Sequence, residues 1–194
     1  MVRVAFIVEG ASEKMLIESK GFRDWATQIG VVVCDPVIDA KGGGNLLPQN
    51  VEPMIDQVKR SKPDRIVILT DLEHESTVEA VRTRIGARHT DDIFVAVKAL
   101  EAWFLADTGA LRHWLKVPDI YEEFPERTPA MPWGRLVELA NSYGSRGPGP
   151  SKPKFARKYI GTHGFEVFNA AQHPNCPSAQ LFCRGLVSLA QGGA

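Results

Sequence analysis

The chain has 194 residues, about the length of one domain, and 44% of them are hydrophobic and 24% charged. This composition is typical of a globular protein and excludes a disordered or fibrous one. Because the 23 basic and 23 acidic side chains cancel, the net charge argues against a protein that holds nucleic acid by overall charge alone, but not against a local basic groove.

Three further features concern the compartment in which the chain works. No apolar run reaches the roughly 18 residues of a membrane-spanning helix, so we expect no membrane association. The N-terminal segment reaches Glu9 before an apolar region typical of signal peptides is complete. Three cysteines without a Cys-x-x-Cys pair indicate a reducing compartment and no disulfide framework, so we expect a cytoplasmic protein.

The first half of the chain alternates between strand and helix patterns. In chain order we predict a strand at 2–8, a helix at 13–29 capped by Ser12, a strand at 31–33 and 37–38 that proline interrupts, a helix at 46–60, a strand at 65–70, a helix at 77–85, a strand at 93–97 and a helix at 100–105. This alternation predicts an α/β fold with a mainly parallel four-stranded sheet flanked by helices.

The second half is different, because it contains only short helical patterns separated by proline-rich connections. The predicted helices lie at 109–116, 133–143, 153–160, 164–171 and 178–190. We therefore predict an α/β core at 1–108 and a helical C-terminal extension at 109–194 that packs on it. A separately folding second domain is disfavoured, because so short a segment with few aromatic residues makes a thin core.

The charges are unevenly distributed along the second half. From Asn141 to the end there are six basic residues and one acidic residue, Glu166, and five of the six lie within 146–158. An acidic stretch at 119–126 precedes them. Two interpretations stay open: solvated faces of opposite sign, or a phosphate-binding patch beside a metal site.

Acidic residues follow two of the predicted strands. Glu9 comes directly after the first strand, and Asp71 and Glu73 come directly after the strand at 65–70. Because the carboxyl ends of parallel strands meet at one edge of a sheet, we expect these carboxylates to converge if the strands are neighbours. A divalent cation such as Mg²⁺ or Mn²⁺ would relieve their repulsion. The alternative is that they cap and solubilise loops.

Two other residue types beside these acids suit a phosphate ligand. Gly10 allows the backbone to approach a phosphate without a Cβ atom in the way. Lys152 and Lys154 can act as point charges on phosphate, and their alternation around Pro153 predicts that both lie on one side.

The acidic motifs resemble the signature of the Toprim superfamily, with Glu9 after the first strand and Asp71-Leu72-Glu73 where Toprim domains have Asp-x-Asp. The chain more closely resembles an uncharacterised prokaryotic family of small stand-alone Toprim-like proteins. This resemblance rests on VEGASEK at 8–14, EAWFLAD at 101–107 and SKPK at 151–154.

The resemblance implies that Glu9 acts as general acid or base or shares a metal, and that Asp71 and Glu73 hold Mg²⁺ or Mn²⁺. Glu13 and Glu101 are further candidate ligands. Glu13 has the alternative role of complementing its helix dipole, and Glu101 that of a structural cap.

The resemblance further implies a metal-dependent nuclease that hydrolyses phosphodiester bonds in DNA or RNA, in a setting of mobile-element defence. An alternative is a non-catalytic subunit of a partner ATPase, because members of the family are often encoded beside one. A third is a small-molecule phosphohydrolase. Nucleic acid and an ATPase are thus the expected partners, and a homodimer is compatible with each alternative.

Other chemistries have weaker support. The spacing of His163, His173, Cys176 and Cys183 matches no usual zinc pattern. The glycine run at 42–44 lacks the GK[ST] of a phosphate-binding P-loop and is expected to be a flexible loop. No Gly-x-Ser-x-Gly motif is present, so the sequence does not support serine hydrolase chemistry.

Overall fold

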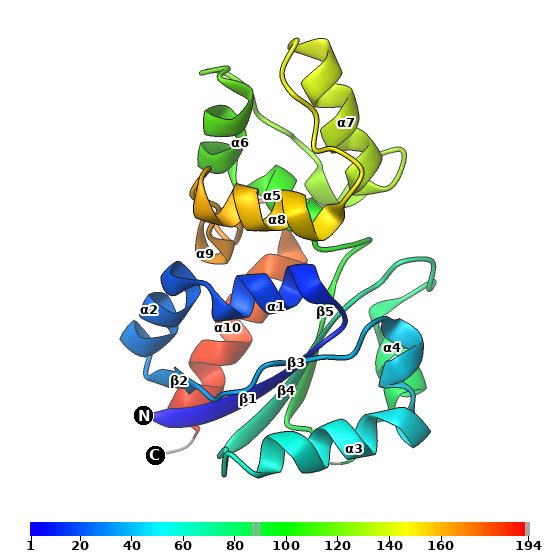
Figure 1. Cartoon of the computed structure of the whole chain (residues 1–194), viewed down its shortest axis with the longest axis vertical. Coiled ribbons are helices and arrows are strands. Elements are labelled where there is room, and N and C mark those ends of the chain that lie inside the picture. The colour runs from blue at the N-terminus through cyan, green and yellow to red at the C-terminus, as the bar shows by residue number, and fades with distance from the viewer. Residues whose placement is uncertain (87, 89, 193–194) are drawn as a thin grey trace.

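The computed structural model describes residues 1–86, 88 and 90–192, and it has an α/β fold with one parallel sheet (Figure 1). Within these residues the strands are β1 (Val2–Val8), β2 (Val31–Val33), β3 (Ile38–Asp39), β4 (Arg65–Asp71) and β5 (Asp92–Ala96). The order across the sheet is β2-β1-β4-β5, and β3 pairs with the end of β1 along the edge that β2 occupies at its start.

The described sheet has five strands, whereas the sequence predicted four. The difference lies in the proline-interrupted strand, which forms two short strands. Cys34 still donates its backbone N–H to the carbonyl of Val4, at 2.8 Å, but Pro36 has no N–H to donate. The ladder along β1 therefore stops after Val33 and resumes at Ile38.

Helices surround the sheet. In the described chain the α-helices are α1 (Ala11–Glu18), α2 (Lys20–Gln28), α3 (Pro48–Lys59), α4 (Val78–Ile85), α5 (Glu101–Ala106), α6 (Thr108–Leu115), α7 (Pro132–Ser142), α8 (Lys152–Gly161), α9 (Val167–Ala170) and α10 (Pro177–Gln191). Two 3₁₀ turns, η1 (Gly43–Leu46) and η2 (Pro125–Arg127), complete the regular structure. None of the helices within these residues is both long and apolar enough to cross a bilayer.

The predicted single helix at 13–29 is wrong, because the chain forms two helices there. Ser19 separates them with an extended backbone, and its side chain accepts a hydrogen bond from the N–H of Phe22 at 3.1 Å. Serine is a good N-cap residue, so it ends one helix and starts the next. The predicted cap of the first helix is also wrong: Gly10 occupies the N-cap position and Ser12 lies inside α1.

Two hydrophobic clusters lie on opposite faces of the sheet, as the alternation of side chains along a strand requires. On β1, Phe6 belongs to one cluster and Ile7 to the other. The second cluster contains apolar residues of α3 and α4. The first contains residues of α1, α2 and α10 and of each helix from α5 to α9, so it includes residues from both sides of the predicted boundary at 108.

The helices α5 to α9 gather beyond the end of the sheet at which β1 and β4 finish (Figure 1). An aromatic cluster holds α8 in this group. The ring of Phe155 lies 5.0 Å from that of Trp114, and the Tyr159 hydroxyl donates to the carbonyl of Phe104 at 3.0 Å. Helix α8 also packs along α1. This packing brings the first turn of α8, with Lys152, to the edge where Glu9 follows β1.

Candidate functional site

The structure brings Glu9 and Asp71 together at the carboxyl ends of two neighbouring strands. The backbone N–H of Glu9 donates to the carbonyl of Leu69 at 2.9 Å, which continues the β1–β4 ladder. Glu9 Oε2 accepts hydrogen bonds from the Thr70 hydroxyl and from the Asp71 backbone N–H, the latter at 3.0 Å. One carboxyl oxygen of Glu9 is thus fixed, while Oε1 accepts no hydrogen bond from the part of the chain that the structure describes.

Asp71 also contacts the chain at the start of α5. Its Oδ1 atom accepts a hydrogen bond from the backbone N–H of Leu100 at 2.9 Å. Leu100 precedes Glu101, which begins α5 and has only 3% of its surface exposed. The Glu101 carboxylate pairs with Lys152 Nζ at 3.1 Å. The backbone of α5 therefore positions a third carboxylate beside the first two.

Glu13 is the fourth carboxylate of the group and lies in the first turn of α1. It is 6% exposed, and a Cβ atom added to Gly10 would lie only 3.1 Å from its Oε2 atom. The pKa of Glu13 is raised from 4.5 to about 7, first by burial and then by the charges of Glu101 and Glu9. The backbone N–H groups of Glu13 and Gly10 act in the opposite direction. The absence of a side chain at Gly10 thus leaves room for Glu13.

We call Glu9, Glu13, Asp71 and Glu101 the acidic centre. Burial raises the pKa of Asp71 well above its ordinary value, and the charges of Glu13, Glu9 and Glu101 raise it further. Burial by itself lowers the pKa of Lys152, but Glu101, Asp71 and Glu13 outweigh this effect and the net pKa is raised. The charges of Glu9 and Glu101 therefore act on both Glu13 and Asp71, which is the electrostatic pattern of a shared site.

The acidic centre lines a cavity of about 390 Å³ at the carboxyl edge of the sheet. Glu73 lines the same cavity, but it is exposed and has a left-handed backbone with φ 48°. Its charge is not among the causes that shift the pKa of Glu13 or Asp71. The structure thus groups Glu13 and Glu101 with Glu9 and Asp71 more closely than it groups Glu73 with them.

The glycine run at 42–44 packs against Glu9. Gly42, with φ 118°, donates its backbone N–H to the Glu9 carbonyl at 2.8 Å, and a Cβ on Gly43 would lie 3.3 Å from Glu9 Oε1. Much of the run forms η1, which corrects the expectation of a flexible loop.

Sequence reasoning also missed Asp39 and Lys41, which line the cavity. The available signal was an acidic residue at a strand end, because Asp39 ends β3 at the same edge.

The sequence implies a divalent cation at this site. No group of three or more His, Cys, Asp or Glu side chains is arranged as a ready metal site in residues 1–86, 88 and 90–192. The donor types nevertheless fit, because Mg²⁺ and Mn²⁺ prefer carboxylate oxygens and the acidic centre concentrates four of these groups. Glu9 and Asp71 each retain a carboxyl oxygen without a hydrogen bond from a described residue.

Lys152 and Lys154 do not lie on one side, which corrects the sequence prediction. The expected alternation assumed an extended chain, but both residues lie in the first turn of α8. Residues two apart in a helix point to nearly opposite sides. Lys152 consequently lines the cavity of the acidic centre, whereas Lys154 lines a different cavity beside Gly147 and Pro148.

The histidines and cysteines considered for zinc do not come together in the described part of the molecule. His163 Nδ1 contacts His113 Nδ1 at 3.1 Å, and His173 stacks on Tyr121 at 4.8 Å between ring centroids. The three cysteines are free and buried.

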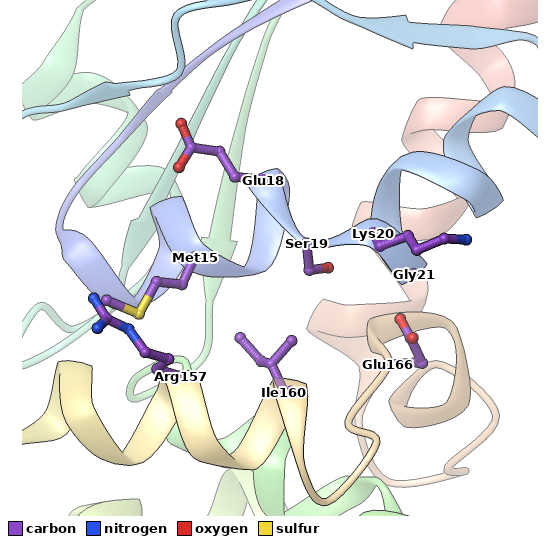
Figure 2. A pocket seen from close by; sticks show the side chains of 9 residues that line it. Met15, Glu18, Ser19, Lys20, Gly21, Arg157, Ile160 and Glu166 are labelled. Carbon is purple, nitrogen blue, oxygen red and sulfur yellow. The ribbon is translucent and has the colours of Figure 1, made fainter.

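Another cavity, of about 430 Å³, lies apart from the acidic centre between α1, α2 and α8. Figure 2 shows Met15 and Ile160 pointing into it, Arg157 beside Met15, and Glu166 directed toward Gly21. It contains both acidic and basic side chains around an apolar floor. None of the four carboxylates of the acidic centre lines it, so it contributes nothing to the chemistry of that site.

Fold and site together define an α/β protein with an acidic cleft at the carboxyl edge of a parallel sheet. Comparisons of the chain with protein-family models, with curated proteins and with solved structures find no match. The function is therefore inferred from the residues of the site.

Proposed function

We propose that the protein is a Toprim-type phosphodiesterase that depends on a divalent cation and hydrolyses nucleic acid. The observation that carries this proposal is the convergence of the acidic centre with Lys152 at a single sheet edge. The motifs around Glu9 and Asp71, which resemble those of Toprim domains, support it independently.

The roles of the side chains follow from their surroundings. Thr70 and the Asp71 backbone hold Glu9 in one orientation, so its second oxygen is available for a proton or a cation. Asp71 is held by the N–H of Leu100 in the same way. Lys152, which Glu101 anchors at 3.1 Å, presents a positive charge to a phosphate at the cavity.

Glu9, Asp71, Glu13 and Glu101 are the residues that would hold Mg²⁺ or Mn²⁺. When bound, such an ion supplies charge neutralisation at the phosphate and lowers the pKa of water. The acidic side chains would be deprotonated in that state, so binding of the ion and release of protons are linked.

The proposal is tested by nicking of supercoiled plasmid DNA and cleavage of an RNA oligonucleotide with Mg²⁺ or Mn²⁺. We expect Asp71→Asn to reduce the rate by about 10²- to 10⁴-fold, the range typical of a lost acid–base or ligand group. The matched change Glu73→Gln should reduce it less, because Glu73 is exposed. Equal rates for the wild type and Asp71→Asn would remove the proposal.

A second candidate is a non-catalytic subunit of a partner ATPase. The observation that favours it is the lack of a ready metal site among the described residues, together with Glu73 in place of the usual aspartate. Calorimetric titration with Mn²⁺ separates the two. Heat of Mn²⁺ binding that disappears in Asp71→Asn supports the phosphodiesterase. The absence of Mn²⁺ binding, together with co-purification of an ATPase encoded beside this protein, supports the non-catalytic subunit.

A further inference from the structure

A second concave surface begins at the same end of α8 as the acidic centre. We call it the basic groove: a cavity of about 320 Å³ between α8 and the segment 146–151. Its charged lining residues are Arg146, Lys154 and Lys158, which are all exposed. No acidic side chain lines the groove, and these three cations form no ion pair with any residue that the structure describes.

This concentration of charge is not an average property of the molecule. Acidic and basic residues are equal in number over the chain, but the segment 146–158 contains five basic residues and no acidic one. Three unpaired cations around one hollow create a local positive potential that attracts an anion. Ser151 already caps the N–H of Lys154 at 3.4 Å, so the attraction comes from the side chains rather than from the helix end.

The walls of the groove are well supported. Trp114 and Phe155 line its buried side, with 7% and 5% of their surfaces exposed. The opposite wall is the Gly-Pro-Gly-Pro segment at 147–150, in which the two prolines fix φ and restrict the backbone. A preformed wall loses little conformational entropy when a ligand binds.

The groove and the acidic centre share one turn of chain. Lys152 and Pro153 line the acidic cavity, while Ser151 and Lys154 line the groove. A helical turn rises only about 5.4 Å, so the two sites lie at the same level of α8, on different sides of its first turn. A ligand that occupied both would carry two anionic groups close together along a chain.

We propose that the basic groove binds the phosphate adjacent to the one that lies at the acidic centre, so that the substrate is a polynucleotide strand and not a single nucleotide or a phosphate monoester. This inference rests on the proposed function of the acidic centre. Arg146, Lys154 and Lys158 would contact the phosphate backbone and not the bases, so the groove contributes affinity without sequence preference.

The test compares two triple variants of the full chain that remove the same charge. The groove variant is Arg146→Gln with Lys154→Gln and Lys158→Gln. The control variant changes three exposed cations elsewhere, at the end of α3 and on α10, by Arg60→Gln, Lys62→Gln and Arg184→Gln. Circular dichroism and the Tm of each variant establish that both are folded.

Binding of a labelled single strand of about 20 nucleotides, longer than a typical site of roughly 4–16, is measured in EDTA over a range of salt concentrations. We expect the groove variant to bind at least about tenfold more weakly at low salt, and the slope of log K against log salt to fall by about 1 to 2. Binding by the control variant should change by less than about threefold. Equal losses in the two variants would overturn the inference.

The same variants separate this inference from the proposed function. If the groove variant loses binding but no protein cleaves nucleic acid with Mg²⁺ or Mn²⁺, the groove stands as a phosphate-binding surface and the nuclease proposal falls. If the wild type cleaves, and the groove variant retains both its kcat/KM and its binding, the nuclease proposal stands and the groove inference is overturned.

Discussion

Removing the charge of Glu13 tests the electrostatics of the acidic centre without any assumption about its substrate. Glu13 is buried, and its pKa is raised from 4.5 to about 7, first by that burial and then by the charges of Glu101 and Glu9. The folded protein therefore holds a proton at this site more tightly than the unfolded chain does. Ionised Glu13 consequently destabilises the folded protein. This effect is absent below pH 4.5, grows as the pH rises and is complete above about pH 7.

The magnitude follows from the two pKa values. A rise from 4.5 to about 7, at about 1.4 kcal/mol per pH unit, corresponds to roughly 3 kcal/mol. Glutamine fills nearly the same volume without the charge. We therefore expect Glu13→Gln to be more stable than the wild type at pH 8 without divalent cations, by roughly 1–3 kcal/mol, and by less than about 1 kcal/mol at pH 5.

The measurement is urea unfolding in EDTA at the two pH values, followed by tryptophan fluorescence. Glu18→Gln is the matched control, because Glu18 ends the same helix, is 38% exposed at its side chain and pairs with Lys14 at 3.7 Å. Removal of such a surface pair changes stability by less than about 1 kcal/mol. The reasoning is refuted if Glu13→Gln is no more stable than the wild type at pH 8, or if its gain is the same at pH 5.

Three further predictions concern packing. A Cβ on Gly185 would lie 2.3 Å from the ring of Phe94, so Gly185→Ala should destabilise the protein by about 1–3 kcal/mol. A Cβ on Gly134 would lie 3.8 Å from its nearest neighbour, so Gly134→Ala should stabilise the protein by up to about 1 kcal/mol. Urea unfolding that ranked the two variants in the opposite order would contradict this. Ser178→Ala should cost about 1–3 kcal/mol in thermal unfolding, because the Trp103 indole N–H loses its acceptor at 2.7 Å; an unchanged Tm would speak against that bond. All three cysteines are buried, so Ellman's reagent should label none in the native protein and all in urea, and rapid native labelling would show that the core opens.

The strands were predictable because their signal is local. Continuous apolar runs at β1 and β4 require a sheet that is covered on both faces, and the structure places helices on both. The break at Ser19 was not predictable in the same way. The sequence on either side of it is helical, and only the cap that Ser19 gives to Phe22 shows where one helix stops.

The candidate site was predictable where it depends on strand order and not where it depends on packing. Glu9 follows β1 and Asp71 ends β4, so a parallel sheet suffices to bring them together. Glu13 and Glu101 were only further candidates, because their place beside Asp71 depends on the entry of α1 and on the bond from Leu100 to Asp71. No spacing in the sequence encodes either contact.

The two lysines of the α8 N-terminus show what the local conformation decides. The segment Ser-Lys-Pro-Lys at 151–154 would place both lysines on one side if the chain were extended, but it places them on nearly opposite sides in a helix. Pro153 does not distinguish these cases, because proline is accepted in the first turn of a helix. Only the helical conformation lets one residue complete the acidic centre while its near neighbour faces the basic groove, so the neighbouring-phosphate inference depends on α8 starting at Lys152.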